Sequence, residues 1–557
     1  MKILLASQSD KGRSPGAKGG RLVNLYAEVN PEGSKYPFTI YATPGVNKWA
    51  ATGTFGEWQG GQVMGGYLYA FQNNSVYKLL PPFDVTLNAR PTALGTLTGS
   101  VGRLSIANNG TQMAVVTPDG LAFIITSSTV TQITDSDFPL VSYVTFADGY
   151  FIFTTMDSGQ FIISSLYEGT TYDALDFATA EEVPDNLIAG VAFNGGLFLP
   201  GTDSYEFYAN TGNADFPYEQ IPGAANTSRG CAAKFSIVQE DNTLFFLGND
   251  RVVYRMQGYT PQRISTHAVE SAIAKYATVS DCFSFVYTQE GHKFLVMTFP
   301  GANATHVYDI SQGMWHERMS AGGRWMASFY AFFDNKHLVG HKDNGRIYEL
   351  SLDIGQEEID PIIRVAEGAV QWADDDRLTF DEIFIDVQPG RERKLVKKGE
   401  GNNGFATIPQ GFKVVVISDY TVNISDNDTV MVTLDDGSTK FITTAYNDSV
   451  LGTFEIQDPL PQTITEDNLI EVFEPNQHRA ALLGHADPLI SFSYSTDGGI
   501  TFSNVRTCSI GKTGEYKNRA VFRRCGQHRQ FIPRFQFSDP EPITINGAYA
   551  KVRRGVS

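Results

Sequence analysis

Cysteine is scarce in this sequence, with four among 557 residues: Cys231, Cys282, Cys508 and Cys525. No two of them have the Cys-x-x-Cys spacing of a metal site, and four are too few for a disulfide scaffold. The scarcity favours assembly in a reducing cytoplasm. Cys508 and Cys525 fall on neighbouring predicted strands, so they are either two reduced thiols, the interpretation we favour, or a bridged pair.

Long hydrophobic runs are missing as well. The apolar run at the N-terminus covers only residues 3–6, which is too short for the core of a signal peptide. No stretch approaches the ~18 consecutive apolar residues of a membrane-spanning helix. We therefore expect no cleaved export signal and no stable association with a membrane.

Sequence motifs of catalysis and metal binding are also absent. There is no phosphate-binding loop, dinucleotide fingerprint or nucleophile elbow. The three aspartates at residues 374–376 lack the alternation and the terminal glutamate of a calcium loop, and predict a solvated turn. No histidine pair has metal-ligand spacing, so we expect His316 and His341 to cap strands or face solvent. The sequence predicts no catalytic residue, cofactor or metal, and a protein that is not an enzyme.

Positive charge is in deficit, because 43 lysines and arginines face 61 acids and the net charge is -18. The imbalance is uneven. Residues 400–475 hold 13 acids and two lysines, whereas residues 501–557 hold 11 basic residues and three acids. An acidic protein binds nucleic acid poorly, and its charge suits a conduit through which DNA slides without sticking. The basic end indicates either an acidic partner or a solvated face.

What the sequence does contain is a repeat of a strand-turn-strand pattern between about residues 60 and 350. Successive turn residues lie 39 to 53 residues apart, and apolar or aromatic runs flank them. A period of that length without a helical pattern is typical of a β-propeller with one four-stranded blade per repeat. The turn residues are Gly66, Gly110, Gly149, Gly195, Gly248, Gly291 and Asn335.

Strand spacing and composition divide the chain into four parts, and the predicted fold class is all-β. We expect a β-propeller of about seven blades plus a C-terminal β-sandwich-like domain that carries a small all-β insertion. Residues 7–20 have no apolar side chain beyond Ala17, so this arm is expected to be mobile until a partner binds. The parts are an N-terminal arm and first strand (1–57), the propeller (58–360), the sandwich-like domain (361–390 plus 479–557) and an acidic all-β insertion (391–478).

A short motif near the C-terminus matches the Asp-box of sialidase-like propellers. In this β-hairpin turn, side-chain oxygens hydrogen-bond nearby backbone groups and fix the loop, so its role is structural even in enzymes. A sialidase would also need an arginine cluster, a tyrosine nucleophile and an acid, and the sequence does not supply that set. The predicted structural turn comprises Ser495, Asp497, Gly499, Thr501 and Phe502.

A basic run at residues 516–526 places cationic side chains on both faces of a predicted strand. Contact with phosphate and docking to an acidic protein ring are both consistent with it. The candidate interface residues are Arg519, Arg523, Arg524 and Arg529.

Several collinear segments together resemble one family, the packaged-DNA stabilisation proteins, or tail hub (nozzle) proteins, of short-tailed bacteriophages. Each segment is degenerate, and their order is the specific part. Residues 391–478 depart from the pattern as an insertion. The resembling segments are residues 21–28 with 43–45, 201–207 with 211–212, 264–270, 307–309 with Trp315, and 495–502 followed by Arg519, Phe522, Arg523 and Gly526.

The resemblance implies a structural protein of the virion tail, assembled in the host cytoplasm as a homo-oligomer, a hexameric ring. Such a ring extends the DNA channel below the portal and its head-to-tail adaptor, helps to retain packaged DNA and conducts it at ejection. Its implied partners are the adaptor, a tailspike or tail fibre, a tail needle or plug, and double-stranded DNA that passes without specific binding. A ring requires two different patches on each subunit, and the basic C-terminal residues and the acidic insertion are a candidate complementary pair.

Two other functions remain open from the sequence. The first alternative is a receptor-binding propeller of the tail that recognises host glycans, which would need an aromatic and polar pocket on one face. The second is an Asp-box glycosidase, which would turn over a glycoside substrate.

Overall fold

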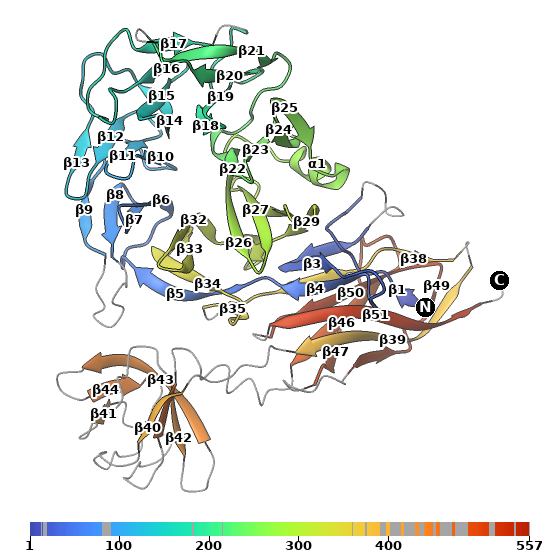
Figure 1. Cartoon of the computed structure of the whole chain (residues 1–557). Coiled ribbons are helices and arrows are strands. Elements are labelled where there is room, and N and C mark those ends of the chain that lie inside the picture. Colours follow the sequence, from blue (N-terminus) through green and yellow to red (C-terminus); the bar gives the residue numbers. More distant parts are fainter. Residues whose placement is uncertain are drawn as a thin grey trace.

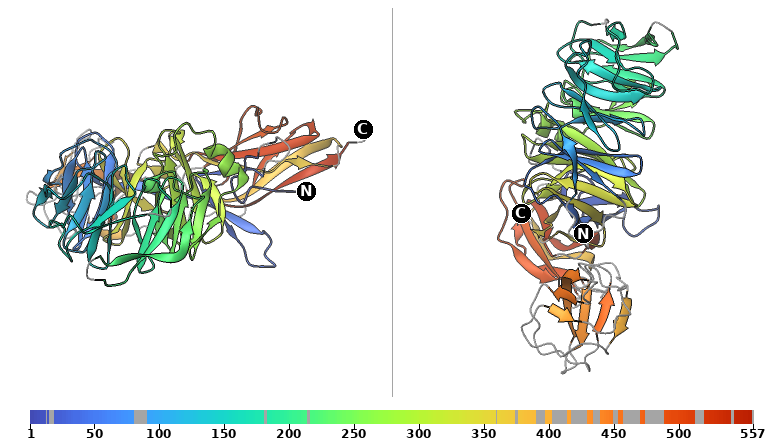
Figure 2. Two further views of the ribbon diagram at one scale, coloured as in Figure 1. Left: turned by 90° about the horizontal axis from the view of Figure 1, so that it is seen from above. Right: turned by 90° about the vertical axis from the view of Figure 1, so that its left-hand side faces the viewer.

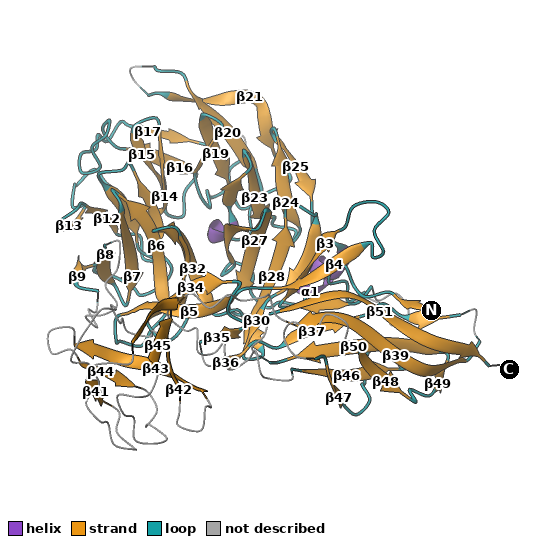
Figure 3. Cartoon of the chain, turned by 60° about the horizontal axis from the view of Figure 1, so that its bottom comes forward, coloured by secondary structure: helices purple, strands orange, loops and turns teal. Residues whose placement is uncertain are grey.

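The computed structural model describes residues 1–389 and 488–555, except 13, 15–18, 81–90, 181–182, 214–215, 359, 374–375, 512–518 and 540–541, with the backbone of six strands between residues 397 and 473. Within these residues the chain is almost entirely strand and loop, and α1 (His267–Ile273) is the α-helix (Figure 3). A 3₁₀ turn, η3 (Lys234–Ser236), is shorter still. The predicted all-β class is confirmed.

The described residues contain seven blades arranged in a ring (Figure 1). Each blade is an antiparallel sheet of four strands, and the first strand lies nearest the centre of the ring. The blades are β6 (Trp58–Met64), β7 (Tyr67–Gln72), β8 (Ser75–Leu79), β9 (Ala93–Thr96); β10 (Ser105–Asn108), β11 (Met113–Val116), β12 (Ala122–Ile125), β13 (Val130–Gln132); β14 (Val141–Ala147), β15 (Tyr150–Thr155), β16 (Gln160–Ile163), β17 (Phe177–Thr179); β18 (Val191–Phe193), β19 (Gly196–Pro200), β20 (Tyr205–Asn210), β21 (Tyr218–Asn226); β22 (Val238–Glu240), β23 (Thr243–Leu247), β24 (Val253–Gln257), β25 (Thr260–Arg263); β26 (Phe283–Gln289), β27 (His292–Phe299), β28 (Ala304–Asp309), β29 (Met314–Glu317); and β32 (Ala327–Phe333), β33 (Lys336–His341), β34 (Arg346–Ser351), β5 (Gly45–Ala51).

Two-residue turns join the first and second strands of six blades, and both turn residues have positive φ. Such turns match the twist of the flanking strands, which explains their glycine, asparagine and aspartate. In the fifth blade this turn is Asp241–Asn242, with φ values of 51° and 52°. The predicted turn residue Gly248 instead lies between the second and third strands of this blade, which explains the long spacing from Gly195.

The ring is closed by a strand from the N-terminal segment. β5 pairs antiparallel with β34 and supplies the fourth strand of the seventh blade. Its inward residues Val46, Trp49 and Ala50 are buried against that blade and its neighbours. The first and last parts of the propeller sequence are therefore held together by a strand ladder.

The C-terminal domain is a β-sandwich around one apolar core, as the sequence predicts. Rings from both sheets meet there; Phe380 and Phe531, for example, stack with centroids 4.2 Å apart. One sheet contains β1 (Lys2–Ile3), β3 (Leu25–Val29), β4 (Phe38–Ala42), β39 (Leu378–Pro389), β48 (Ala520–Arg523), β49 (Gln527–His528) and β51 (Ile543–Arg554). The other contains β2 (Arg21–Val23), β37 (Arg364–Glu367), β38 (Gln371–Trp372), β46 (Leu489–Ser495), β47 (Arg506–Ser509) and β50 (Gln530–Phe537).

The N-terminal segment contributes strands to both domains. The Met1 ammonium donates to the Ala550 carbonyl at 2.7 Å, and the Ser9 amide donates to the Trp315 carbonyl at 2.6 Å. Ile3 and Ser9 are buried. Residues 1–12 are thus anchored, and the expectation that the arm is mobile from residue 7 was wrong for its described part, because local composition does not reveal these distant partners.

The sandwich projects from one side of the ring, and both chain termini lie at its far end (Figures 1 and 2). Short hairpins, β30 (Met319–Ser320) with β31 (Gly323–Arg324) and β35 (Gln356–Glu357) with β36 (Asp360–Pro361), lie close to the junction. Between residues 397 and 473, six strands form a separate sheet: β40 (Lys397–Gly401), β41 (Val414–Val416), β42 (Thr429–Thr433), β43 (Thr439–Asp448), β44 (Thr453–Ile456) and β45 (Ile470–Phe473).

Candidate functional site at the propeller–sandwich junction

The two domains share one continuous sheet. β29, the last strand of the sixth blade, pairs with β2, which pairs with β37, which pairs with β50 of the sandwich. Together with the rest of the blade and of the sandwich sheet they form a ten-stranded sheet. The step between β29 and β2 consists of one residue pair, Val23 with Glu317, where the Asn24 amide donates to the Glu317 carbonyl at 2.9 Å. Relative movement of the domains would break this backbone bridge.

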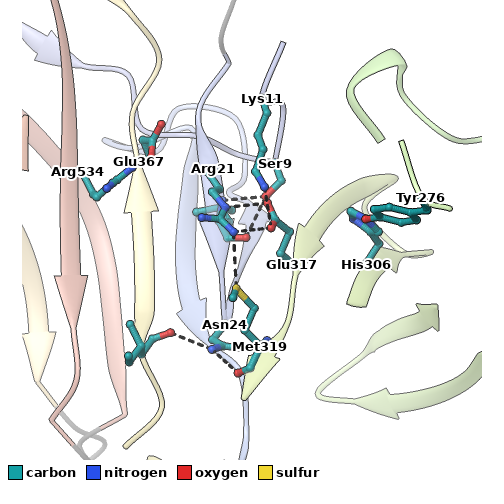
Figure 4. A network of polar contacts seen from close by, with 12 residues as sticks. Ser9, Lys11, Arg21, Asn24, Tyr276, His306, Glu317, Met319, Glu367 and Arg534 are labelled. Carbon is teal, nitrogen blue, oxygen red and sulfur yellow. Dashed lines mark hydrogen bonds and ion pairs between the residues drawn. The ribbon is translucent and has the colours of Figure 1, made fainter. Parts of the chain in front are cut away.

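A row of alternating charges crosses this boundary, strand by strand (Figure 4). Glu317 on β29 accepts from Arg21 Nε at 2.9 Å and Nη2 at 2.7 Å, and from Lys11 Nζ at 3.1 Å. Burial would raise the pKa of Glu317, but the hydrogen bonds and charge of Arg21, with the charge of Lys11, lower this pKa to about 2. The carboxylate therefore stays ionised inside the junction.

The row continues into the sandwich. Arg21 stands opposite Glu367 in the β2–β37 register, and Glu367 stands opposite Arg534 on β50. Arg534 donates to Glu367 Oε2 from Nε at 3.1 Å and from Nη2 at 3.0 Å. Its guanidinium carbon lies 3.2 Å from the centroid of the Phe502 ring. The row thus ends against the Asp-box turn and links it mechanically to the propeller.

Asn24 ties three segments together at the end of β2. Its side-chain amide donates to the carbonyls of Met319 at 3.0 Å and Ile363 at 2.9 Å, and its carbonyl oxygen accepts from the Met319 amide at 3.0 Å. The residue has φ of 54°, a conformation that asparagine tolerates better than most residues. It fixes the point where the chain turns from the junction sheet into β3.

Buried arginines support the junction from inside. Arg318, 2% exposed, donates to the Tyr287 hydroxyl at 3.0 Å and to the Pro44 carbonyl at 2.7 Å, and it stacks 3.6 Å from the Trp325 ring. Burial lowers the pKa of this guanidinium. Arg364 at the start of β37 is fully buried and donates to the Gly355 carbonyl at 2.8 Å. These contacts join blade, connecting loop and sandwich.

The histidines of the last two blades are mostly part of the core. His316 is 2% exposed, and burial lowers its pKa to about 3, so the expectation that it caps a strand or faces solvent was wrong. His341 accepts backbone hydrogens of Asp343 and Asn344 and caps that turn. His306 shares a hydrogen bond of 2.8 Å with the Tyr276 hydroxyl beside the charge row (Figure 4).

The predicted Asp-box forms a closed set of hydrogen bonds. Asp497 Oδ1 accepts from Ser495 Oγ at 2.6 Å and from the amides of Ile500 and Thr501 at 2.9 Å, and Oδ2 accepts from Thr501 Oγ1 at 2.5 Å. The Gly499 amide donates to Ser495 Oγ at 2.8 Å. Hydrogen bonds from Ser495 and Thr501 hold the pKa of Asp497 well below its usual range. A carboxylate so engaged is a poor proton donor.

The four predicted interface arginines lie on the exposed side of the sandwich sheet. Arg519 pairs with Asp386 at 2.7 Å and Arg523 with Glu382 at 3.1 Å, so both charges are partly compensated within the subunit. Arg524 and Arg529 are exposed, and Arg524 has φ of 57°. Arg523 ends β48, which pairs with β39, and Arg519 directly precedes that strand, but the structure assigns none of the four to a partner.

Cys508 and Cys525 are free thiols, as are Cys231 and Cys282. Arg506 Nη2 lies 3.1 Å from the Cys525 sulfur. Of the three aspartates at 374–376, the first two lie outside the described residues, and Asp376 faces Arg554 at 3.9 Å. In the described part of the chain, no group of three acidic, histidine or cysteine side chains could hold a metal ion, and no helix is long and apolar enough to cross a membrane.

The fold and junction define a class: a β-propeller–sandwich protein whose buried charged residues connect the two domains. Comparison with known proteins identifies the family. The bacteriophage P22 Gp10 β-propeller family (phage stabilisation) matches residues 20–355, more than half of the chain, and the bacteriophage P22 Gp10 β-sandwich family matches residues 477–553. The chain belongs to the phage stabilisation family of P22 Gp10 and is a structural protein of a phage virion, as the resemblance in its sequence implies.

Other comparisons add little. The search of curated proteins found no match. Among solved structures, the computationally designed protein Ika8 is similar over 60% of this chain and 99% of its own, with 14% identity and a TM-score of 0.35. A likeness of that size carries no argument about function.

Proposed function

We propose that this chain is one subunit of a ring in the phage tail that extends the channel below the portal and its adaptor. The ring helps to retain packaged DNA, conducts it at ejection, and anchors tailspikes or fibres. It is a homo-oligomer, a hexamer, that also meets a tail needle or plug, and it is not an enzyme. The observation that carries the proposal is the family match across both domains.

Two physical features support a role in a ring that withstands the pressure of packaged DNA and lets the DNA pass. The ten-stranded junction sheet makes the propeller and sandwich one continuous structure, which suits a ring that bears the pressure of packaged DNA. The net charge of -18 disfavours binding to DNA phosphates and suits a lumen through which DNA moves. Neither feature depends on a catalytic group.

The deciding experiment uses phage particles produced without this protein. Heads that fill with DNA and then lose it, with portal and adaptor present, would support a hub that seals the channel. Full-length protein supplied in trans should restore retention, which controls for damage elsewhere in the genome. Heads that keep their DNA but fail to adsorb to cells would instead favour the receptor-binding alternative.

A further inference from the structure

The centre of the propeller contains a polar cavity that the proposed function does not use. Its volume is about 210 Å³, and the first strands or preceding loops of six blades line it. Residues at the starts of β10, β26 and β32 contribute, with Gln62 of β6 and Tyr143 of β14. Several lining side chains are only partly buried, so that solutes reach the cavity. It is far larger than the ~10–15 Å³ needed for one water.

Arg103 is the charged residue that lines this cavity. Its guanidinium carbon stacks 3.5 Å from the centroid of Phe283, and Nη2 donates to the Ser328 carbonyl at 2.5 Å. Among the described residues, no carboxylate lies within ion-pair distance of it. Burial lowers the pKa of Arg103 to about 10, so the group is still cationic at neutral pH. Arg103 is partly exposed, and although the charge of Glu57 acts on it from a distance, no carboxylate contacts it, so an anion from solution can pair with it.

Further hydrogen-bonding groups around the cavity are also unused. Neither the Tyr143 hydroxyl nor the Gln62 side-chain NH2 group donates a hydrogen bond in the described part of the protein, so both donors are available to a solute in the cavity. Lys234, whose Nζ donates to the Ser142 carbonyl at 2.9 Å, adds positive charge next to the lining residue Phe235. Hydrogen-bond donors without a protein acceptor beside a cationic cavity match a ligand that supplies acceptor oxygens.

We propose that this axial cavity binds one small oxyanion, a phosphate or a short carboxylate. The Arg103 guanidinium supplies two parallel N–H groups to two oxygens of the anion, as arginine does for carboxylates and phosphates generally. The Tyr143 hydroxyl and the Gln62 amide donate to the remaining oxygens. The site is independent of the ring proposed above, because it requires only a folded subunit.

The test is calorimetric titration of the purified full chain in chloride buffer, with inorganic phosphate and with malonate in separate experiments. We expect saturable binding of at least one anion with one site per chain. Arg103→Gln should weaken it about tenfold or more, since a charge-assisted hydrogen bond contributes about 1.5–3 kcal/mol. Tyr143→Phe and Gln62→Ala should each weaken it severalfold. Lys275→Gln, which removes an exposed charge on the segment between α1 and β26, should change nothing.

Each result bears on the proposal. Binding of phosphate alone or of malonate alone supports it and selects the anion. If Arg103→Gln does not fold, Tyr143→Phe and Gln62→Ala decide, because both remove groups without a partner in the protein. Absence of saturable binding by either anion overturns the proposal. So does binding that all three cavity variants leave unchanged, because the anion would then lie elsewhere.

Discussion

At the scale of single residues, the junction depends on charges that are buried and paired. Glu317 has a side chain only 11% exposed and forms ion pairs with both Arg21 and Lys11. Removing one partner of a buried ion pair leaves the other charge buried without compensation. This lowers stability more than replacing both partners with apolar residues would. The row of charges is therefore expected to be sensitive to loss of a single member.

We expect Glu317→Gln to destabilise the protein in a pH-dependent way. The pKa of Glu317 falls from 4.5 to about 2 on folding, so its contribution is complete above pH 4.5 and disappears as the pH falls towards 2. A shift of that size corresponds to on the order of 3 kcal/mol. Thermal unfolding followed from pH 7 to pH 2.5 should show a lower melting temperature for the variant at pH 7 and a difference that shrinks in acid.

Glu32→Gln is the matched control, because Glu32 is exposed and forms no ion pair with any residue that the structure describes. It should follow the wild-type curve at every pH. A Glu317→Gln variant that melts with the wild type at pH 7 would contradict the assignment. So would a difference that stays constant down to pH 2.5, since the loss would then come from packing and not from the charge.

The sequence identified local sites and missed those built from distant residues. The Asp-box was recognisable because every hydrogen bond of Asp497 joins residues within four positions of it. Arg21, Glu317, Glu367 and Arg534 carry no such signal. Each is one polar residue in a strand, and only the parallel pairing of β2 with β29 brings the first two together. Strand alternation predicts which face a residue occupies but not which strand lies beside it.

At the scale of elements, turn chemistry accounts for both the success and the error of the repeat. Six of the seven turn residues fall in the first hairpin of a blade. In the fifth blade, Asp241 and Asn242 form that hairpin without glycine, and the predicted turn residue Gly248 lies after the second strand, between β23 and β24. The closing strand β5 could not be placed either, because its partner β34 lies about 300 residues further along the chain.

Closure by β5 predicts a difference between its buried and its exposed positions. Val46, 1% exposed, packs in a cluster with Tyr348 and Leu350 of the seventh blade and with residues of the sixth, whereas Lys48 is exposed. Val46→Asp should lower the free energy of unfolding by several kcal/mol, because a carboxylate would be buried without a partner. Lys48→Asp introduces an aspartate at an exposed position two residues further along the strand, and it should be tolerated. Circular dichroism melts of the two full-length variants compare them.

If Lys48→Asp proves as damaging as Val46→Asp, then charge reversal and not burial is responsible. If neither variant changes the melt, the strand does not close the ring in solution. Only a loss confined to Val46→Asp agrees with β5 as the fourth strand of the seventh blade.

At the scale of the whole molecule, ring formation requires two different patches on each subunit. The sandwich offers a cationic one around Arg523 and Arg524. We expect the double substitution Arg523→Glu with Arg524→Glu to reduce ring assembly on the portal–adaptor complex, because it reverses the charge of the patch. Electron microscopy or native mass spectrometry of assembled tails would measure it. Lys275→Glu, on the propeller, is the control for charge alone.

Arg523 also pairs with Glu382 within its own subunit, so folding must be measured in parallel. The pair is exposed and contributes little to stability. Variants that melt normally but do not assemble would support an interface. Variants that melt normally and assemble fully would show that this patch is not an interface between subunits.

The insertion is the part of the molecule whose role the family match does not define, and its connections predict that it is dispensable for folding. Its six strands form their own sheet and pair with no strand of the sandwich in the described residues. Its two ends leave and rejoin the sandwich at one place. Pro389 pairs with Ile543, and the Leu489 amide donates to Asp539 Oδ2 at 2.5 Å, four residues away from Ile543. Four residues span at most ~14 Å.

We therefore expect a chain in which a ten-residue Gly/Ser linker replaces residues 391–487 to fold and to melt at the wild-type temperature, since ten residues reach ~33 Å. Calorimetry of both chains measures this. A replacement of residues 21–23 by glycines, which removes β2 from the junction sheet, is the opposite control and should lower the melting temperature. If the shortened chain is stable and its particles retain DNA but carry no tailspikes or fibres, the insertion is the anchoring site. If the shortened chain is stable but its particles leak DNA, the insertion forms part of the channel.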